Sequence, residues 1–93
     1  MHVLVIETTI YLPWCQSLKD KRQIRQGLID RLEKRHRLSV KEIDSQDVWK
    51  TLTLGMAAVV LSETGARELE DSIRQIIEDH SNGQIRDWDA DLL

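Results

Sequence analysis

The sequence has little of several residue types on which many small-protein sites depend. Its 93 residues include one cysteine, one proline, four glycines and no phenylalanine. The lone thiol, Cys15, excludes an internal disulfide and a multi-cysteine metal site, and this is typical of a reducing cytosol. The glycines are scattered along the chain, so there is no glycine-rich phosphate loop.

Long apolar runs are also missing. The apolar N-terminal stretch reaches Glu7 too early for a signal peptide, and it is far shorter than a membrane span. We therefore expect a cytoplasmic protein that makes no membrane contact. With 41% hydrophobic and 31% charged residues the composition is that of a folded protein, and its length predicts one domain over residues 1–93.

Hydrophobic periodicity predicts four strands and two helices. We expect strands over residues 2–12, 38–45, 49–61 and 84–88, and helices over residues 17–35 and from about 63 to 80. Ser17 is a good N-cap, and Asn82 or Gly83 can take the positive φ that ends a helix. The apolar positions shift near Glu42, which indicates a β-bulge. Gly27 inside the first helix suggests a close packing contact.

The order β-α-β-β-α-β is the plan of a ferredoxin-like α+β fold. It predicts a two-layer sandwich, with two helices on one face of a four-stranded antiparallel sheet. The other sheet face would then stay uncovered unless a second molecule packs on it. A homodimer is therefore one hypothesis, with candidate interface residues on the first and third strands and Trp88 as an alternative to Trp49. The candidates are Val3, Val5, Tyr11 and Trp49.

Charge is distributed unevenly, although the net charge is only −3. Residues 17–41 hold nine Lys or Arg against three acids, whereas residues 63–93 hold nine acids against three Arg. The simpler interpretation is two solvated helices. The alternative is a basic face that contacts the phosphates of RNA or of a ribosomal particle. The candidate RNA-binding residues are Lys19, Lys21, Arg22 and Arg25.

No pattern of residues favours catalysis. Cys15 precedes a helix, which would stabilise a thiolate, but no histidine is near it in sequence, so a packed thiol is favoured. Glu42, Asp44 and Asp47 crowd one turn, where they would either bind a divalent ion or, as we prefer, bond to the local backbone. The three histidines are isolated. We expect a non-enzymatic protein with no cofactor and no metal.

RNA recognition on the sheet face would need aromatic side chains on the central strands. The predicted third strand offers Leu, Met, Ala and Val instead, and the first strand offers only Tyr11. Base stacking on the sheet is therefore disfavoured, and phosphate contacts from the basic helix remain.

Four segments resemble the YlxP-like family of small bacterial proteins. They are residues 17–22 (SLKDKR), 28–32 (LIDRL), 44–49 (DSQDVW) and 54–55 (LG). The resemblance runs from the first strand to the last and implies a ferredoxin-like fold. Genes of this family often lie beside those of a translation initiation factor and a ribosome-binding factor, which implies a role near translation. The chain departs from the family at Trp14, where we expect a small residue.

Overall fold

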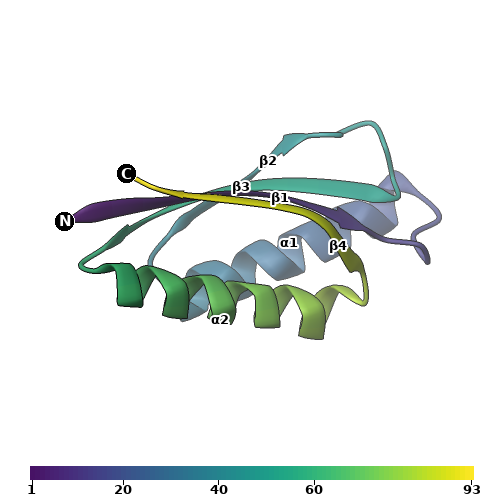
Figure 1. Cartoon of the computed structure of the whole chain (residues 1–93). Coiled ribbons are helices and arrows are strands. Elements are labelled where there is room, and N and C mark those ends of the chain that lie inside the picture. The colour runs from purple at the N-terminus through teal and green to yellow at the C-terminus, as the bar shows by residue number, and fades with distance from the viewer.

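The computed structural model describes all residues 1–93 and has the predicted order of elements (Figure 1). The strands are β1 (His2–Tyr11), β2 (Ser39–Asp44), β3 (Thr51–Val60) and β4 (Gln84–Leu92). The helices are α1 (Leu18–Arg35) and α2 (Glu63–Ser81). The expected β-α-β-β-α-β plan is confirmed.

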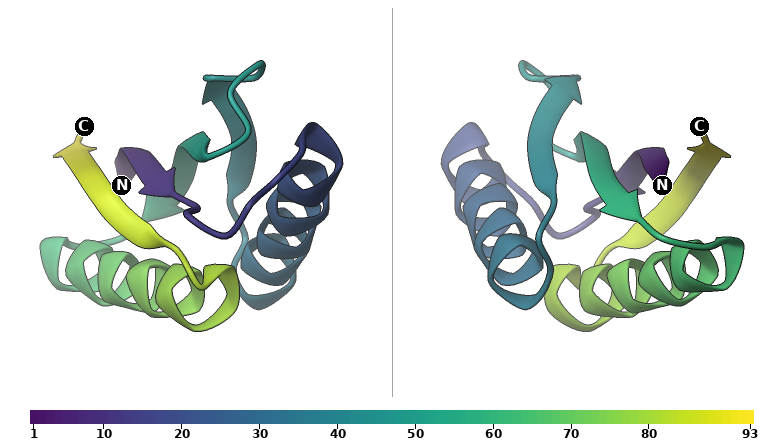
Figure 2. Two further views of the ribbon diagram at one scale, coloured as in Figure 1. Left: turned by 90° about the vertical axis from the view of Figure 1, so that its right-hand side faces the viewer. Right: turned by 90° about the vertical axis from the view of Figure 1, so that its left-hand side faces the viewer.

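The four strands form one antiparallel sheet in the order β2-β3-β1-β4. Both helices lie on the same side of this sheet, α1 towards β2 and α2 towards β4 (Figure 2). The chain ends lie together, because Val3 and Leu93 exchange two backbone hydrogen bonds of 3.0 and 2.9 Å. The opposite face of the sheet carries no helix.

Alternation along the two central strands explains which face is buried. Even-numbered side chains of β1 and β3, such as Ile6 and Leu54, point at the helices and form the core. The sequence alone does not show which face of β3 is buried, because both faces are apolar. Gly55 lies on the outer face, where a Cβ would come within 2.8 Å of the Ile43 Cγ2. Ile43 stands at the predicted bulge, between Glu42 and Asp44.

Both helices begin at a serine N-cap, of which Ser17 was predicted from the sequence. The Ser17 hydroxyl accepts a hydrogen bond from the Asp20 N–H at 3.1 Å, and the Ser62 hydroxyl accepts one from the Gly65 N–H at 3.0 Å. Asn82 ends α2 with φ of 53°. Neither helix is long and apolar enough to cross a membrane.

Three local predictions are wrong. β4 continues past Trp88 to Leu92, because β1 supplies backbone partners for its acidic second half. β3 begins at Thr51, and Trp49 lies in the preceding loop instead of a strand. Gly27 marks no close packing, since a Cβ there would meet only the flexible Arg31 side chain, at 3.1 Å.

Candidate nucleic-acid interface

Lys21, one of the predicted RNA-binding residues, is buried between α1 and β2. Its side chain is 2% exposed, and its ammonium group lies 2.8 Å from a carboxylate oxygen of Glu42. The same group donates hydrogen bonds to the backbone carbonyls of Ser45 and Val48, the latter at 2.8 Å. Lys21 therefore holds the loop between β2 and β3 and is not available to a phosphate.

Glu42 is the centre of this buried cluster. It sits on the inner face of β2, and its other carboxylate oxygen accepts a hydrogen bond from Arg25 at 2.9 Å. Burial alone raises the pKa of Glu42, but the hydrogen bonds and charges of Lys21 and Arg25 outweigh burial. The pKa of Glu42 therefore lies below its ordinary value, and the carboxylate stays ionised at neutral pH.

The predicted set of four basic residues is therefore corrected. Lys21 is buried and therefore leaves the set of candidate RNA-binding residues. Arg25 is half-buried and forms an ion pair with Glu42. Lys19 and Arg22 are exposed. The sequence held a signal for the correction, because Lys21 lies seven residues before the buried Leu28 and so shares its helix face.

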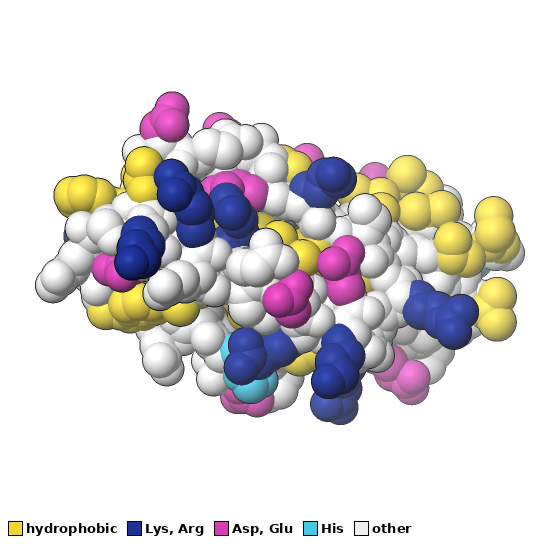
Figure 3. All heavy atoms as spheres, turned by 180° about the vertical axis from the view of Figure 1, so that it is seen from behind, with side chains coloured by type: hydrophobic (Ala, Val, Ile, Leu, Met, Phe, Trp, Pro, Cys, Tyr) yellow, Lys and Arg dark blue, Asp and Glu magenta, His cyan; other side chains and the backbone are white.

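Basic side chains without an ion-pair partner remain on and after α1. The two salt bridges of the chain both involve Glu42, so the other cations of this segment have no acidic partner within 4.0 Å. Figure 3, which faces α1, shows Lys and Arg side chains spread over this face with acidic ones between them. The exposed cations are Lys19, Arg22, Arg31, Lys34, Arg35, Arg37 and Lys41.

A shallow groove between the two helices gathers three of these cations. It has a volume of about 380 Å³ and is lined by Arg31, Lys34 and Arg35 from α1 and by Ile76 and His80 from α2. This groove was not predicted from the sequence, because the candidate residues all came from the start of the first helix. Pairing of α1 with the end of α2 is a tertiary relationship that no local spacing indicates.

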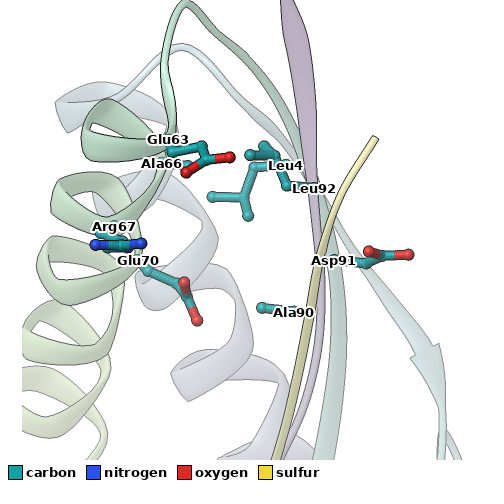
Figure 4. Close-up of a pocket in the computed structure, with 8 residues that line it drawn as sticks. All are labelled: Leu4, Glu63, Ala66, Arg67, Glu70, Ala90, Asp91 and Leu92. Carbon is teal, nitrogen blue, oxygen red and sulfur yellow. The ribbon is translucent and has the colours of Figure 1, made fainter.

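The second hollow of similar size has the opposite character (Figure 4). It lies between the start of α2 and β4, with a volume of about 340 Å³. Glu63 and Glu70 face it from α2 beside a single cation, Arg67, while Asp91 points away from the helix (Figure 4). Carboxylates at the rim repel phosphate, so this hollow does not suit a polyanion.

The alternatives for Cys15 and the acidic turn are decided by burial and local bonds. Cys15 is buried, and its thiol donates to the Ser17 carbonyl at 3.3 Å, so the packed thiol is confirmed. The Asp44 carboxylate accepts a hydrogen bond from the Ser45 N–H at 2.8 Å, which confirms the turn interpretation for this residue. For Glu42 the turn interpretation is wrong, because Glu42 lies in β2 and pairs with Lys21 and Arg25. No group of three His, Cys, Asp or Glu is placed to hold a metal ion.

The predicted dimer-interface residues do not form one patch. Val3 and Val5 lie near one end of the outer sheet face, whereas Tyr11 lies at the other end of β1 beneath Arg86, whose guanidinium is 4.5 Å from the ring centre. Trp49 belongs to the loop before β3.

Trp88 was the alternative to Trp49 as an anchor on the outer face, and that hypothesis is wrong. It lies on the inner face of the sheet, where its indole N–H donates to Glu70 at 2.6 Å and Arg74 covers its ring at 4.6 Å. Association itself stays a prediction.

Comparison with known proteins gives a family and a fold. A family model described as "Protein of unknown function (DUF503)" matches residues 3–90. An "Uncharacterized protein YlxP" of Bacillus subtilis (strain 168) is 37% identical over 43 residues, which span 46% of this chain and 47% of that protein. The structure is similar to the "De novo designed protein Ferredog-Diesel", with a TM-score of 0.51, 12% identity, and coverage of 96% and 83% of the two chains. That likeness confirms the ferredoxin-like fold.

Proposed function

We propose that this chain, which belongs to the DUF503 family of proteins of unknown function, is a non-enzymatic accessory protein that binds RNA or a ribosomal particle. The binding surface is the exposed side of α1, extended by the groove that α1 forms with the end of α2. The observation that carries the proposal is the set of exposed cations on one helix with no ion-pair partner.

The groove gathers three of the exposed cations in one hollow. Arg31, Lys34 and Arg35 come from consecutive turns of α1 and line one hollow, and His80 adds two ring nitrogens that can donate when protonated. Arginine presents a planar set of donors that matches phosphate oxygens, and lysine adds a compact charge. A phosphate bound there would meet cations from one side and the apolar Ile76 from the other.

The other side of the molecule supports the same choice of face. The outer sheet face carries exposed carboxylates on β1 and β4, and Glu7 stands directly opposite Asp89 in the strand register. Asp87 and Asp91 continue this row along β4. These charges repel phosphates, so they disfavour binding of a polyanion on the outer sheet face.

The test is co-sedimentation with purified ribosomal subunits, together with anisotropy of a labelled ribosomal RNA fragment, at low and moderate salt. Raising salt fourfold should weaken binding about 50-fold if four phosphates of an unpaired strand are contacted. Binding that does not change with salt would rule out recognition through phosphate contacts.

Charge reversal locates the surface. The double variant Lys34→Glu/Arg35→Glu should weaken RNA binding at least tenfold and flatten the salt dependence, since two phosphate contacts are lost. Its matched control is Arg67→Glu/Arg86→Glu, which changes the net charge equally on α2 and β4. Equal loss in both variants would mean that only net charge matters, and the groove would have no special role.

A second candidate is a homodimeric interaction module that uses one end of the outer sheet face. The observation in its favour is the apolar row of Val59 on β3, Val3 on β1 and Leu93 directly after β4, in which Val59 is 63% exposed. Sedimentation equilibrium of the free protein tests it. A dimer that Val59→Glu converts to a monomer supports the module, and a monomer at high concentration removes it.

A further inference from the structure

Two of the three tryptophans are left open to solvent at one end of the molecule. Trp14 lies in the loop between β1 and α1 and is 39% exposed, and Trp49 lies in the loop between β2 and β3 and is 47% exposed. The neighbouring Val48 is 50% exposed. Trp88, in contrast, is covered by α2 and has partners for both its ring and its N–H.

The two loops are bonded to each other, so Trp14 and Trp49 lie at the same end of the molecule. The Lys50 ammonium donates to the Pro13 carbonyl at 2.6 Å, and the Leu12 N–H donates to the Lys50 carbonyl at 2.8 Å. Both loops lie at the same end of the sheet, at the right in Figure 1.

Each loop is also anchored to the body of the protein. The Trp14 indole N–H donates to the Ser81 carbonyl at the end of α2, at 3.2 Å. The Trp49 loop is held through the Val48 carbonyl by the buried Lys21. A binding surface fixed in this way loses little conformational entropy when a ligand arrives.

Cations of α1 adjoin the loop that carries Trp49. A hollow of about 240 Å³ brings Arg22 and Arg25 of α1 together with Gln46 and Asp47 of the Trp49 loop. Lys19 is exposed one turn before Arg22. Asp47 is the exposed acid of this loop, while the Asp20 carboxylate is engaged by the Gln16 N–H at 3.1 Å. Arg25 is already paired with Glu42, so Lys19 and Arg22 are the two exposed cations left here for a ligand that is both anionic and aromatic.

We propose that Trp14 and Trp49 stack on unpaired bases of an RNA strand whose phosphates lie along Lys19 and Arg22. This inference rests on the proposed function and narrows its substrate to single-stranded RNA or unpaired loops. Aromatic side chains beside a basic groove are how proteins hold single strands without reading their sequence. Bases inside a duplex are stacked on one another, so they cannot use these indoles.

The experiment compares two labelled RNAs by anisotropy, an unstructured strand of about 12 nucleotides and a fully paired duplex of the same sequence. The full-length protein should prefer the single strand. Trp49→Ala should weaken single-strand binding about tenfold and leave duplex binding unchanged, and Trp49→Phe should keep most of the affinity. Leu61→Ala, an exposed apolar residue beyond β3, is the matched control and should change neither.

The outcomes separate this inference from the function on which it rests. If the charge-reversal pair Lys34→Glu/Arg35→Glu weakens RNA binding but the Trp49 and Trp14 variants do not, RNA binding stands and stacking is overturned. The tryptophans would then mark a protein contact. If neither RNA binds at low salt, both proposals are lost. Trp14→Ala removes an anchoring hydrogen bond, so its thermal melt is recorded, and the exposed Trp49 decides the test.

Discussion

Lys21 and Glu42 form an ion pair that is almost completely withdrawn from water. Their charged atoms are 2.8 Å apart, and the two side chains are 2% and 7% exposed. The pair joins α1 to β2, and its lysine also holds the loop that carries Trp49. A buried lysine is stable only when its charge has partners. Glu42 and the two loop carbonyls supply them, so Lys21 fixes the position of the loop.

Lys21→Met should lower the free energy of unfolding by about 3–5 kcal/mol, the usual loss when one partner of a buried ion pair is removed. The cause is the carboxylate left without its nearest cation and the two loop carbonyls left without a donor. Urea unfolding followed by circular dichroism measures the change. Lys19→Met, exposed on the same helix, should have little effect, and the double variant Lys21→Met/Glu42→Leu should recover part of the loss. Equal stability of the Lys21→Met and Lys19→Met variants would contradict the assignment.

Glu42 should make the protein sensitive to acid. Its pKa in the folded state is lowered from the ordinary value of 4.5, because Lys21 and Arg25 outweigh the effect of burial. Below pH 4.5 the unfolded chain therefore binds more protons at this residue than the folded chain, and stability falls as pH falls through the folded pKa. Thermal melts from pH 6 down to about 3 test this. In Glu42→Gln this part of the slope should disappear, and an unchanged slope would show that other carboxylates control it.

His36 should make the stability of the protein depend on pH in a higher pH range than Glu42 does. It caps α1 and its Nε2 lies 2.8 Å from the Ser72 hydroxyl of α2. Burial, and then the charge of Arg35, lower the pKa of His36 from 6.5. The folded state therefore resists protonation, so stability present above pH 6.5 declines as pH falls below it. NMR titration of the imidazole measures the pKa, and His36→Gln should flatten the stability profile between about pH 7 and 5. A pKa at or above 6.5 would refute the prediction.

Glycine-to-alanine substitutions at two positions should have opposite signs. Gly55→Ala forces a Cβ to within 2.8 Å of the Ile43 Cγ2, so we expect a loss of about 1–3 kcal/mol. Gly27→Ala lies inside α1, and its Cβ meets only the flexible Arg31 side chain. The higher helix propensity of alanine should therefore raise the free energy of unfolding by about 1 kcal/mol. Chemical denaturation of both variants tests this pair. Adding Ile43→Ala should rescue Gly55→Ala, and failure of that rescue would place the strain elsewhere.

Local signals determined much of the fold. Several features could be predicted from the sequence because each depends on residues within a few positions of one another. They are the alternation in β1 and β3, the serine caps, Asn82 and the bulge beside Glu42. The length of β4 could not be predicted from the sequence. Its second half is acidic, which is typical of an unstructured tail, and only backbone pairing with β1 makes it a strand.

The sequence by itself also determined that the basic residues gather around the first helix, since charge is a property of each residue. Only the tertiary structure decided which of them face water. Lys21 is buried because β2 brings Glu42 within 2.8 Å, and Arg31, Lys34 and Arg35 share a groove because α2 brings His80 beside them. The loops that carry the exposed Trp14 and Trp49 lie side by side only because Lys50 bonds them together. Such contacts join residues far apart in the chain, and local periodicity carries no information about them.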